Sequence, residues 1–153
     1  SALVELLHFD HPSADIDAPA VRNRSSNCLL LMAQLFGKKF HSTMVGSSEV
    51  MVRLGTFLDT YDDGLEHAPR GHVEVEDMLK PVVRIAQVLL YIVRAGGDRL
   101  EAVRKCKPLV CALRRRSREN TGTWDGMILS SGSWSGQSLS KLLGAVIRHI
   151  DDE

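Results

Sequence analysis

Residues 95–118 read AGGDRLEAVRKCKPLVCALRRRSR, and the order of glycines, apolar residues and proline in this stretch predicts how the chain folds. Gly96 and Gly97 are expected to end the long apolar segment before them, because glycine adopts the left-handed conformation of a helix C-terminus at low cost. Asp98 can cap a short helix that follows. Pro108 lacks an amide hydrogen and fixes its φ, so it suits the first turn of a new helix. The stretch therefore predicts two helices that meet at an angle.

Helical periodicity covers most of the chain, and no strong alternation of apolar and polar residues marks a sheet. Ser48 is the expected N-cap of one helix, and Pro81 is expected to start or kink another. Residues 37–48 should contain a turn and a short helix. The sequence predicts an all-α fold, with one helical domain over 1–153 that belongs to a larger repeat protein. The main helices are expected at 2–9, 20–36, 49–61, 74–95 and 138–150.

The same order of elements recurs along the chain. SALVELL at 1–7, SEVMVRLGTFL at 48–58 and KPLVCALRR at 107–115 are alike, and the segments before the last two end in glycine turns. This pattern resembles the armadillo repeat, with a long third helix, a glycine turn, a short first helix and a bend into the second helix. The resemblance implies a short right-handed α-solenoid. HEAT-type helical pairs or an irregular helical bundle are the alternatives.

In such a repeat the third helices line an extended surface that binds a segment of another protein. The resemblance therefore implies a non-enzymatic interaction or scaffold module. Gln34 and Ile92 occupy the places where peptide-binding armadillo proteins carry asparagines, so that particular binding mode is not expected. Replacing Arg84 and Arg94 together should weaken partner binding and leave the melting temperature nearly unchanged. The candidate partner contacts, all expected to face solvent, are Arg22, Gln34, Arg84, Gln87, Tyr91 and Arg94.

A run of basic residues between 104 and 118 is the sharpest charged feature. Because Lys+Arg and Asp+Glu both total 19, any attraction to a polyanion must be local. The run suits the negative end of a helix dipole, and it also predicts a site for an acidic partner or, as the alternative function, for RNA. Aromatic residues that could stack on bases do not accompany it. The run comprises Arg104, Lys105, Lys107, Arg114, Arg115, Arg116 and Arg118.

Catalytic and metal-binding patterns are weak. Ser138 and Lys141 match S-x-x-K at a helix start, which leaves a small hydrolase as a third reading, but a cap explains the serine as well. His8 with Asp10 and His11, or His67 with His72, lack a third ligand at metal-binding spacing. Neither a phosphate loop nor a dinucleotide fingerprint is present. We therefore expect no enzyme activity, no metal and no cofactor.

The remaining expectations concern location and assembly. The longest uncharged apolar run, CLLLMAQLFG at 28–37, is too short to cross a bilayer, and three cysteines suit a reducing compartment. A cytoplasmic or nuclear protein is expected. Trp124 and Trp134 should anchor the loop at 118–137 to the core or form an interface. Open solenoid ends would expose apolar faces and predict a homodimer.

Overall fold

A computed structural model describes residues 2–8, 18–60, 72–119, 124–130, 132 and 134–152 of the chain. These residues are almost entirely helical, and the only β pairing among them is an isolated antiparallel bridge between Ile128 and Ser138. The prediction of an all-α fold is confirmed. The elements are α1 (Ala2–Leu6), α2 (Ala18–Val45), α3 (Ser48–Thr60), α4 (His72–Arg94), α5 (Gly97–Lys105), α6 (Lys107–Glu119), the 3-10 turn η1 (Trp124–Gly126) and α7 (Leu139–Asp151).

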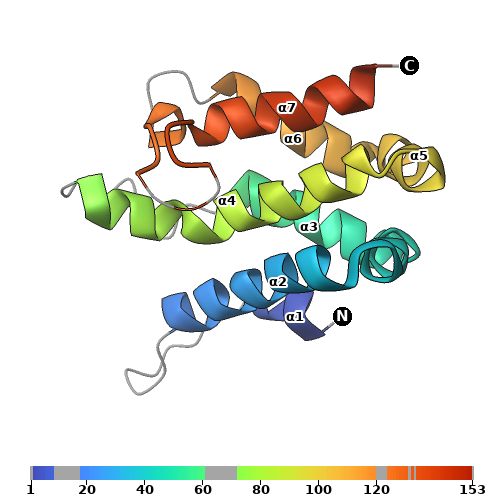
Figure 1. Cartoon of the computed structure of the whole chain (residues 1–153), viewed down its shortest axis with the longest axis horizontal. Coiled ribbons are helices and arrows are strands. Elements are labelled where there is room, and N and C mark those ends of the chain that lie inside the picture. Colours follow the sequence, from blue (N-terminus) through green and yellow to red (C-terminus); the bar gives the residue numbers. More distant parts are fainter. Residues whose placement is uncertain are drawn as a thin grey trace.

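The helices form two layers (Figure 1). The first layer contains α2, α4 and α7, with α4 in the middle and in contact with both neighbours. The second layer contains α1, α3 and α6, and α3 contacts both α1 and α6. The short helix α5 and the end of α2 lie together at one side of both layers. Within the described residues no helix is long and apolar enough to cross a membrane.

The central helix α4 supplies much of the core. Val82, Ile85 and Leu89 are completely buried between the layers, as expected for a helix with neighbours on several sides. Pro81 lies inside α4 and does not start it, because the helix already begins at His72. Without an amide hydrogen, Pro81 leaves the carbonyl of Asp77 without its usual partner four residues later.

The predicted corner at Pro108 is confirmed. Gly96 and Gly97 end α4 with φ values of 67° and 56°, which place both residues in the region that favours glycine. After α5, Cys106 (φ −82°, ψ 82°) interrupts the helix, and α6 begins at residue 107. The cap prediction for Asp98 is wrong, because Gly96 occupies the N-cap position and no side chain bonds there. Asp98 lies in the first turn of α5, where its charge favours the helix dipole.

A second break divides α2 at Gly37, whose φ of 50° and ψ of −121° are not helical. The helix expected up to residue 36 and the short helix after it are therefore confirmed as the two parts of α2. The cap prediction for the next helix is wrong by one residue. The amide of Val50 donates to the Oγ of Ser47 at 3.3 Å, while Ser48 is the first residue of α3.

Helices α3 and α6 approach each other closely at Gly55. A Cβ atom on Gly55 would lie 3.0 Å from the Cα of Leu109 and 3.4 Å from the carbonyl oxygen of Pro108. A Cβ contact of 3.0 Å is tighter than most real ones, so the two backbones would have to move apart by a few tenths of an ångström to admit a larger residue. The corner at Pro108 thus begins at the point where α6 rests against α3.

Candidate functional site

A hollow face runs along α4. Two cavities of about 310 Å³ and about 240 Å³ lie next to each other there, with Gln87 and Trp134 in the lining of both, and together they are here called the α4 groove. Its α4 residues recur every three or four positions, which places them on one helical face. Helix α2 contributes Asn27, Leu30 and Gln34; α4 contributes Glu76, Lys80, Val83, Arg84, Gln87, Leu90, Tyr91 and Arg94; the turn before α7 contributes Leu129, Gly132 and Trp134.

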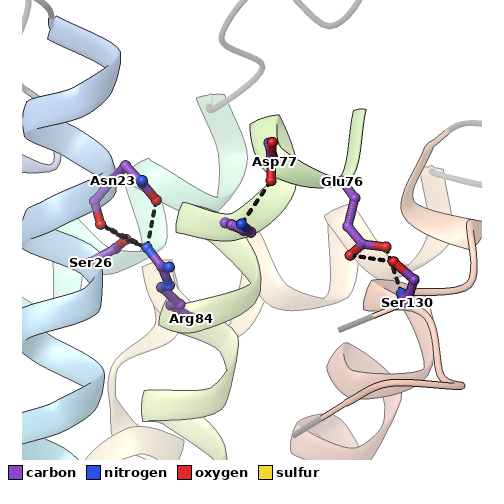
Figure 2. A network of polar contacts seen from close by, with 7 residues as sticks. Asn23, Ser26, Glu76, Asp77, Arg84 and Ser130 are labelled. Carbon is purple, nitrogen blue, oxygen red and sulfur yellow. Dashed lines mark hydrogen bonds and ion pairs between the residues drawn. The ribbon is translucent and has the colours of Figure 1, made fainter. Parts of the chain in front are cut away.

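A polar contact joins α4 to the α2 side of the groove (Figure 2). The Nη1 of Arg84 donates to the backbone carbonyl of Asn23 at 2.8 Å and to its side-chain Oδ1 at 2.5 Å. The Oγ of Ser26 lies 3.4 Å from the same nitrogen. Burial lowers the pKa of Arg84 from its ordinary value, because a half-buried guanidinium loses part of its hydration. Arg84 therefore fastens the two helices and also lines the groove.

A carboxylate holds the opposite side of the groove in place. The Oε1 of Glu76 accepts the backbone N–H of Ser130 at 2.6 Å, and its Oε2 accepts the Ser130 hydroxyl at 2.9 Å (Figure 2). Glu76 is only 6% exposed, so both hydrogen bonds lie where water competes weakly. The turn that leads to α7 is thus tied to the first part of α4.

The same turn positions Trp134. The backbone N–H of Leu129 donates to the carbonyl of Gln137, and the carbonyl of Leu129 accepts the N–H of Gly136, each at 2.8 Å. The side chain of Leu129 is buried in the core. Trp134 is half-buried and packs against the core while it lines the groove. The expectation that a tryptophan anchors this loop is confirmed for Trp134. The side chain of Trp124 lies outside the described residues.

Five of the six predicted partner contacts line the α4 groove, namely Gln34, Arg84, Gln87, Tyr91 and Arg94. Arg22 lies on α2 outside it. The expectation that all six face solvent is wrong for Gln87, which is 7% exposed at the bottom of the groove. Tyr91 and Gln34 also contact each other across α4 and α2, with the Gln34 Nε2 3.4 Å from the tyrosine hydroxyl.

Two further residues, Lys80 and Trp134, line the groove without having been predicted from the sequence. Lys80 lies one turn before Arg84 on the same face of α4, and the helical period alone could have identified it. Trp134 comes from a loop 40 or more residues later in the chain than most of α4, and nothing in the sequence indicates which helix that loop covers. No family model, curated protein or solved structure matches the chain. The groove itself is therefore the feature that points to a function.

The basic segment has a different environment from the one expected. Arg115 pairs with Asp59 of α3 at 2.8 Å. Arg116 is nearly buried and pairs with Asp125 at 2.9 Å, and its Nη1 also donates to the carbonyl of Leu58 at 2.7 Å. These contacts connect α6 to α3 and to η1. Two of the arginines thus hold helices together instead of facing solvent freely.

Two further arginines, Arg114 and Arg104, contact the C-terminal end of α7. Arg114 pairs with Asp151, and this contact raises the pKa of Arg114 and lowers that of Asp151. Arg104 pairs with Glu101 at 2.5 Å, and its Nε donates to the carbonyl of Ile150 at 2.8 Å. Lys105 and Lys107 are exposed, and the side chain of Arg118 lies outside the described residues. The four described arginines of this segment are therefore all paired with carboxylates of the chain.

The other chemical candidates have structural roles or fall outside the description. Ser138 is the N-cap of α7, and its Oγ accepts the backbone N–H of Lys141 at 3.2 Å. His8 stacks on Phe57 with 5.9 Å between ring centres. The described residues contain no group of three His, Cys, Asp or Glu side chains that could hold a metal ion. Asp10, His11, His67 and the side chain of His72 lie outside the described residues.

Proposed function

We propose that this chain is a non-enzymatic interaction module that binds a segment of a partner protein in the α4 groove. The supporting observation is that two neighbouring cavities follow α4 and have Gln87 and Trp134 in common. The groove extends along α4 from Lys80 to Arg94, a helical distance of about 21 Å. Several consecutive residues of a bound segment fit along that length, whereas a small enclosed ligand would leave most of it empty.

The composition of the groove also supports a protein partner. Trp134, Tyr91 and the lining arginines belong to the residue types that contribute most to protein–protein binding. Half-buried Leu30 provides apolar surface beside them, while Val83 and Leu90 are buried in the wall of the groove, and exposed Gln34 offers an amide to the backbone of a bound segment.

We further propose that the helices are arranged as a short right-handed solenoid of the armadillo or HEAT type. In this proposal α4, α7 and the first part of α2 are third helices, and α1, α3 and α6 are second helices. The second part of α2 and α5 are first helices. The two-layer order of contacts and the corners at Gly37, Gly96 and Cys106 support this assignment. A cytoplasmic or nuclear location, in keeping with the three free cysteines, belongs to the same proposal.

Binding of RNA through residues 104–118 has weaker support. Arg104, Arg114, Arg115 and Arg116 already have carboxylate partners within the chain. Releasing them to a phosphate backbone would sacrifice contacts that join α6 to its neighbours. A hydrolase function also has weaker support, because the hydroxyl oxygen of Ser138 serves as the N-cap of α7.

Peptide selection followed by mapping tests the proposed function. The purified chain is used to select from a displayed library of random peptides, and the enriched peptides are titrated into ¹⁵N-labelled protein. We expect the amide resonances that shift most to belong to α2, α4 and the turn at 127–137. Shifts confined to α3 or to residues 104–118, or a selection that enriches nothing, would overturn the proposal.

A further inference from the structure

We infer that the segment bound in the α4 groove is acidic, with carboxylates opposite Arg84 and Arg94 and an apolar side chain against Trp134. This inference rests on the proposed function, and it names the chemistry of the partner. It also moves the acidic-partner site from residues 104–118, where the sequence predicts it, to the groove.

The charges that line the groove are unbalanced. Among the described lining residues the cations are Lys80, Arg84 and Arg94, and the one carboxylate is Glu76, whose two oxygens accept hydrogen bonds from Ser130. Lys80 has a neighbour in Asp77, whose Oδ1 lies 2.7 Å from its Nζ. Arg84 and Arg94 have no carboxylate partner among the described residues. Within the described part of the chain, these two arginines therefore lack an ion-pair partner.

Of the two arginines, Arg84 would be stabilised more than Arg94 by a counterion. Its guanidinium is partly removed from water, yet its acceptors are the neutral carbonyl and amide oxygens of Asn23 and the Ser26 hydroxyl. A partly desolvated charge without an opposite charge is unfavourable, and the guanidinium has further N–H groups with which to bind a carboxylate. A carboxylate on the partner would supply the missing charge without breaking the contact with Asn23, which uses only Nη1.

Arg94 lies at the other end of the groove, beside Tyr91 and Trp134. It is exposed, so it can pair with a partner without losing an internal contact. Ten residues of helix separate Arg84 from Arg94, a distance of about 15 Å. An extended peptide covers that distance in roughly four to five residues, at about 3.3 Å each. We therefore expect two acidic residues four or five positions apart, with an apolar residue between them that reaches Trp134.

The groove and the basic segment differ in a way that favours this assignment. In residues 104–118 four arginines are already paired with carboxylates of the chain. Arg84 and Arg94 have no such carboxylate among the described residues, so an acidic segment can pair with them without displacing an internal ion pair.

The test compares peptides and protein variants that differ by single charges. Peptides selected on the unmodified chain are resynthesised with each Asp or Glu replaced by its amide, and binding is measured by fluorescence anisotropy. We expect the amide versions to bind at least about tenfold more weakly, in line with one lost charge-assisted contact. R94Q should lower the affinity for the acidic peptides by a similar factor. R24Q, which removes an exposed arginine of α2 outside the groove, is the matched control and should leave binding unchanged.

The outcomes separate the two proposals. Two results would overturn the acidic inference and leave the interaction function standing. The first is that peptides which depend on Trp134 for binding are neutral or basic, and the second is that their affinity is unchanged in R94Q. Failure to obtain any peptide that maps to the groove would overturn the interaction function and the inference with it. Polyuridine is titrated in parallel, and binding that is lost in R94Q and displaces the peptides would replace the acidic segment with a nucleic acid. Equal losses in R24Q and R94Q would overturn the assignment to the groove.

Discussion

The guanidinium of Arg84 on α4 binds both the backbone and the side-chain oxygen of Asn23 on α2, 61 positions earlier in the chain. One arginine thus has two functions, because it fixes the separation of the two helices and contributes charge to the groove between them. The expectation that Arg84 and Arg94 could be replaced together without loss of stability is therefore replaced by separate expectations for the two residues.

Arg84→Gln should lower the free energy of unfolding by about 1–3 kcal/mol, because the Asn23 oxygens lose a charged donor in a half-buried place. Arg94→Gln should change it by less than about 0.5 kcal/mol, as is usual for an exposed position without internal partners. Urea unfolding of both variants measures the difference. Similar losses in the two would contradict the distinction drawn between these arginines.

Gly55 and Gly144 should respond oppositely to the same substitution. Gly55→Ala places a Cβ 3.0 Å from the Cα of Leu109 and should destabilise the chain by about 1–3 kcal/mol, since α3 and α6 must separate. A Cβ on Gly144 in α7 meets no atom within 4 Å, so Gly144→Ala should stabilise by about 0.5–1 kcal/mol. Thermal or urea unfolding provides the comparison. Two changes of the same sign would refute the packing of α3 against α6 described above.

Stability should fall when the solution is acidified through the range of histidine titration. Burial is the largest cause that lowers the pKa of His8 and of His41 below the ordinary value of 6.5, and the nearby cations Arg53 and Arg99 act in the same direction. The folded chain therefore favours neutral histidine. Between 6.5 and the lowered pKa the unfolded chain binds more protons, so the stabilisation is complete above that interval and decreases as the pH falls through it.

The contribution of His41 can be isolated with one variant. His41 is buried, with its Nε2 3.2 Å from the carbonyl of Ala33 and no partner for its Nδ1 among the described residues. His41→Gln removes the titrating ring and should flatten the pH dependence of the urea midpoint between about pH 8 and about pH 5. If the variant and the unmodified chain keep identical slopes, His41 does not contribute to acid sensitivity.

The contact between Glu76 and Ser130 should control the turn that carries Trp134. Ser130→Ala removes only the 2.9 Å hydroxyl bond and should have a small effect, about 1 kcal/mol. Glu76→Ala leaves the 2.6 Å N–H without its acceptor as well, and should cost about 2–3 kcal/mol. Hydrogen exchange at Leu129 and Ser130 should accelerate in the same order. Unchanged exchange in Glu76→Ala would show that another contact holds the turn.

The homodimer remains a prediction, and we expect it to use one surface of α2. Leu31, Leu35 and Phe36 of α2 are 44%, 76% and 59% exposed, and such a group of large apolar residues favours association. We expect Leu35→Glu to reduce self-association in sedimentation velocity at increasing protein concentration. Val52→Glu, at an exposed apolar position of α3, is the control. A chain that stays monomeric at every concentration contradicts the dimer prediction.

Local backbone preferences were predictable from the sequence. The corners at Gly96 and Pro108 depend on the conformational properties of single residues, and the apolar stripe of α7 depends on helical period, so neither needs knowledge of distant contacts. The prediction that Ser48 is the N-cap was wrong because the neighbouring Ser47 can accept the same hydrogen bond. The sequence alone does not show at which of the two serines the helix begins.

The candidate site was predictable only in part. The helical period identified the face of α4 that carries Arg84, Tyr91 and Arg94, but it could not indicate that Gln87 would be covered by other elements. Pairs such as Arg115 with Asp59 join residues 56 positions apart, and side-chain type alone does not select one carboxylate among many. The sequence therefore predicted more unpaired charge in the basic segment than the structure has.

Trp134 gives the α4 groove an optical probe of its own. The indole is half-buried and lines both cavities. Any occupant would therefore change the polarity of the indole's surroundings and the access of quenchers to the ring. The chain has two tryptophans, and Trp124→Phe would leave Trp134 as the single emitter. Occupancy could then be followed by ultraviolet fluorescence without attaching a dye to the protein or its ligand.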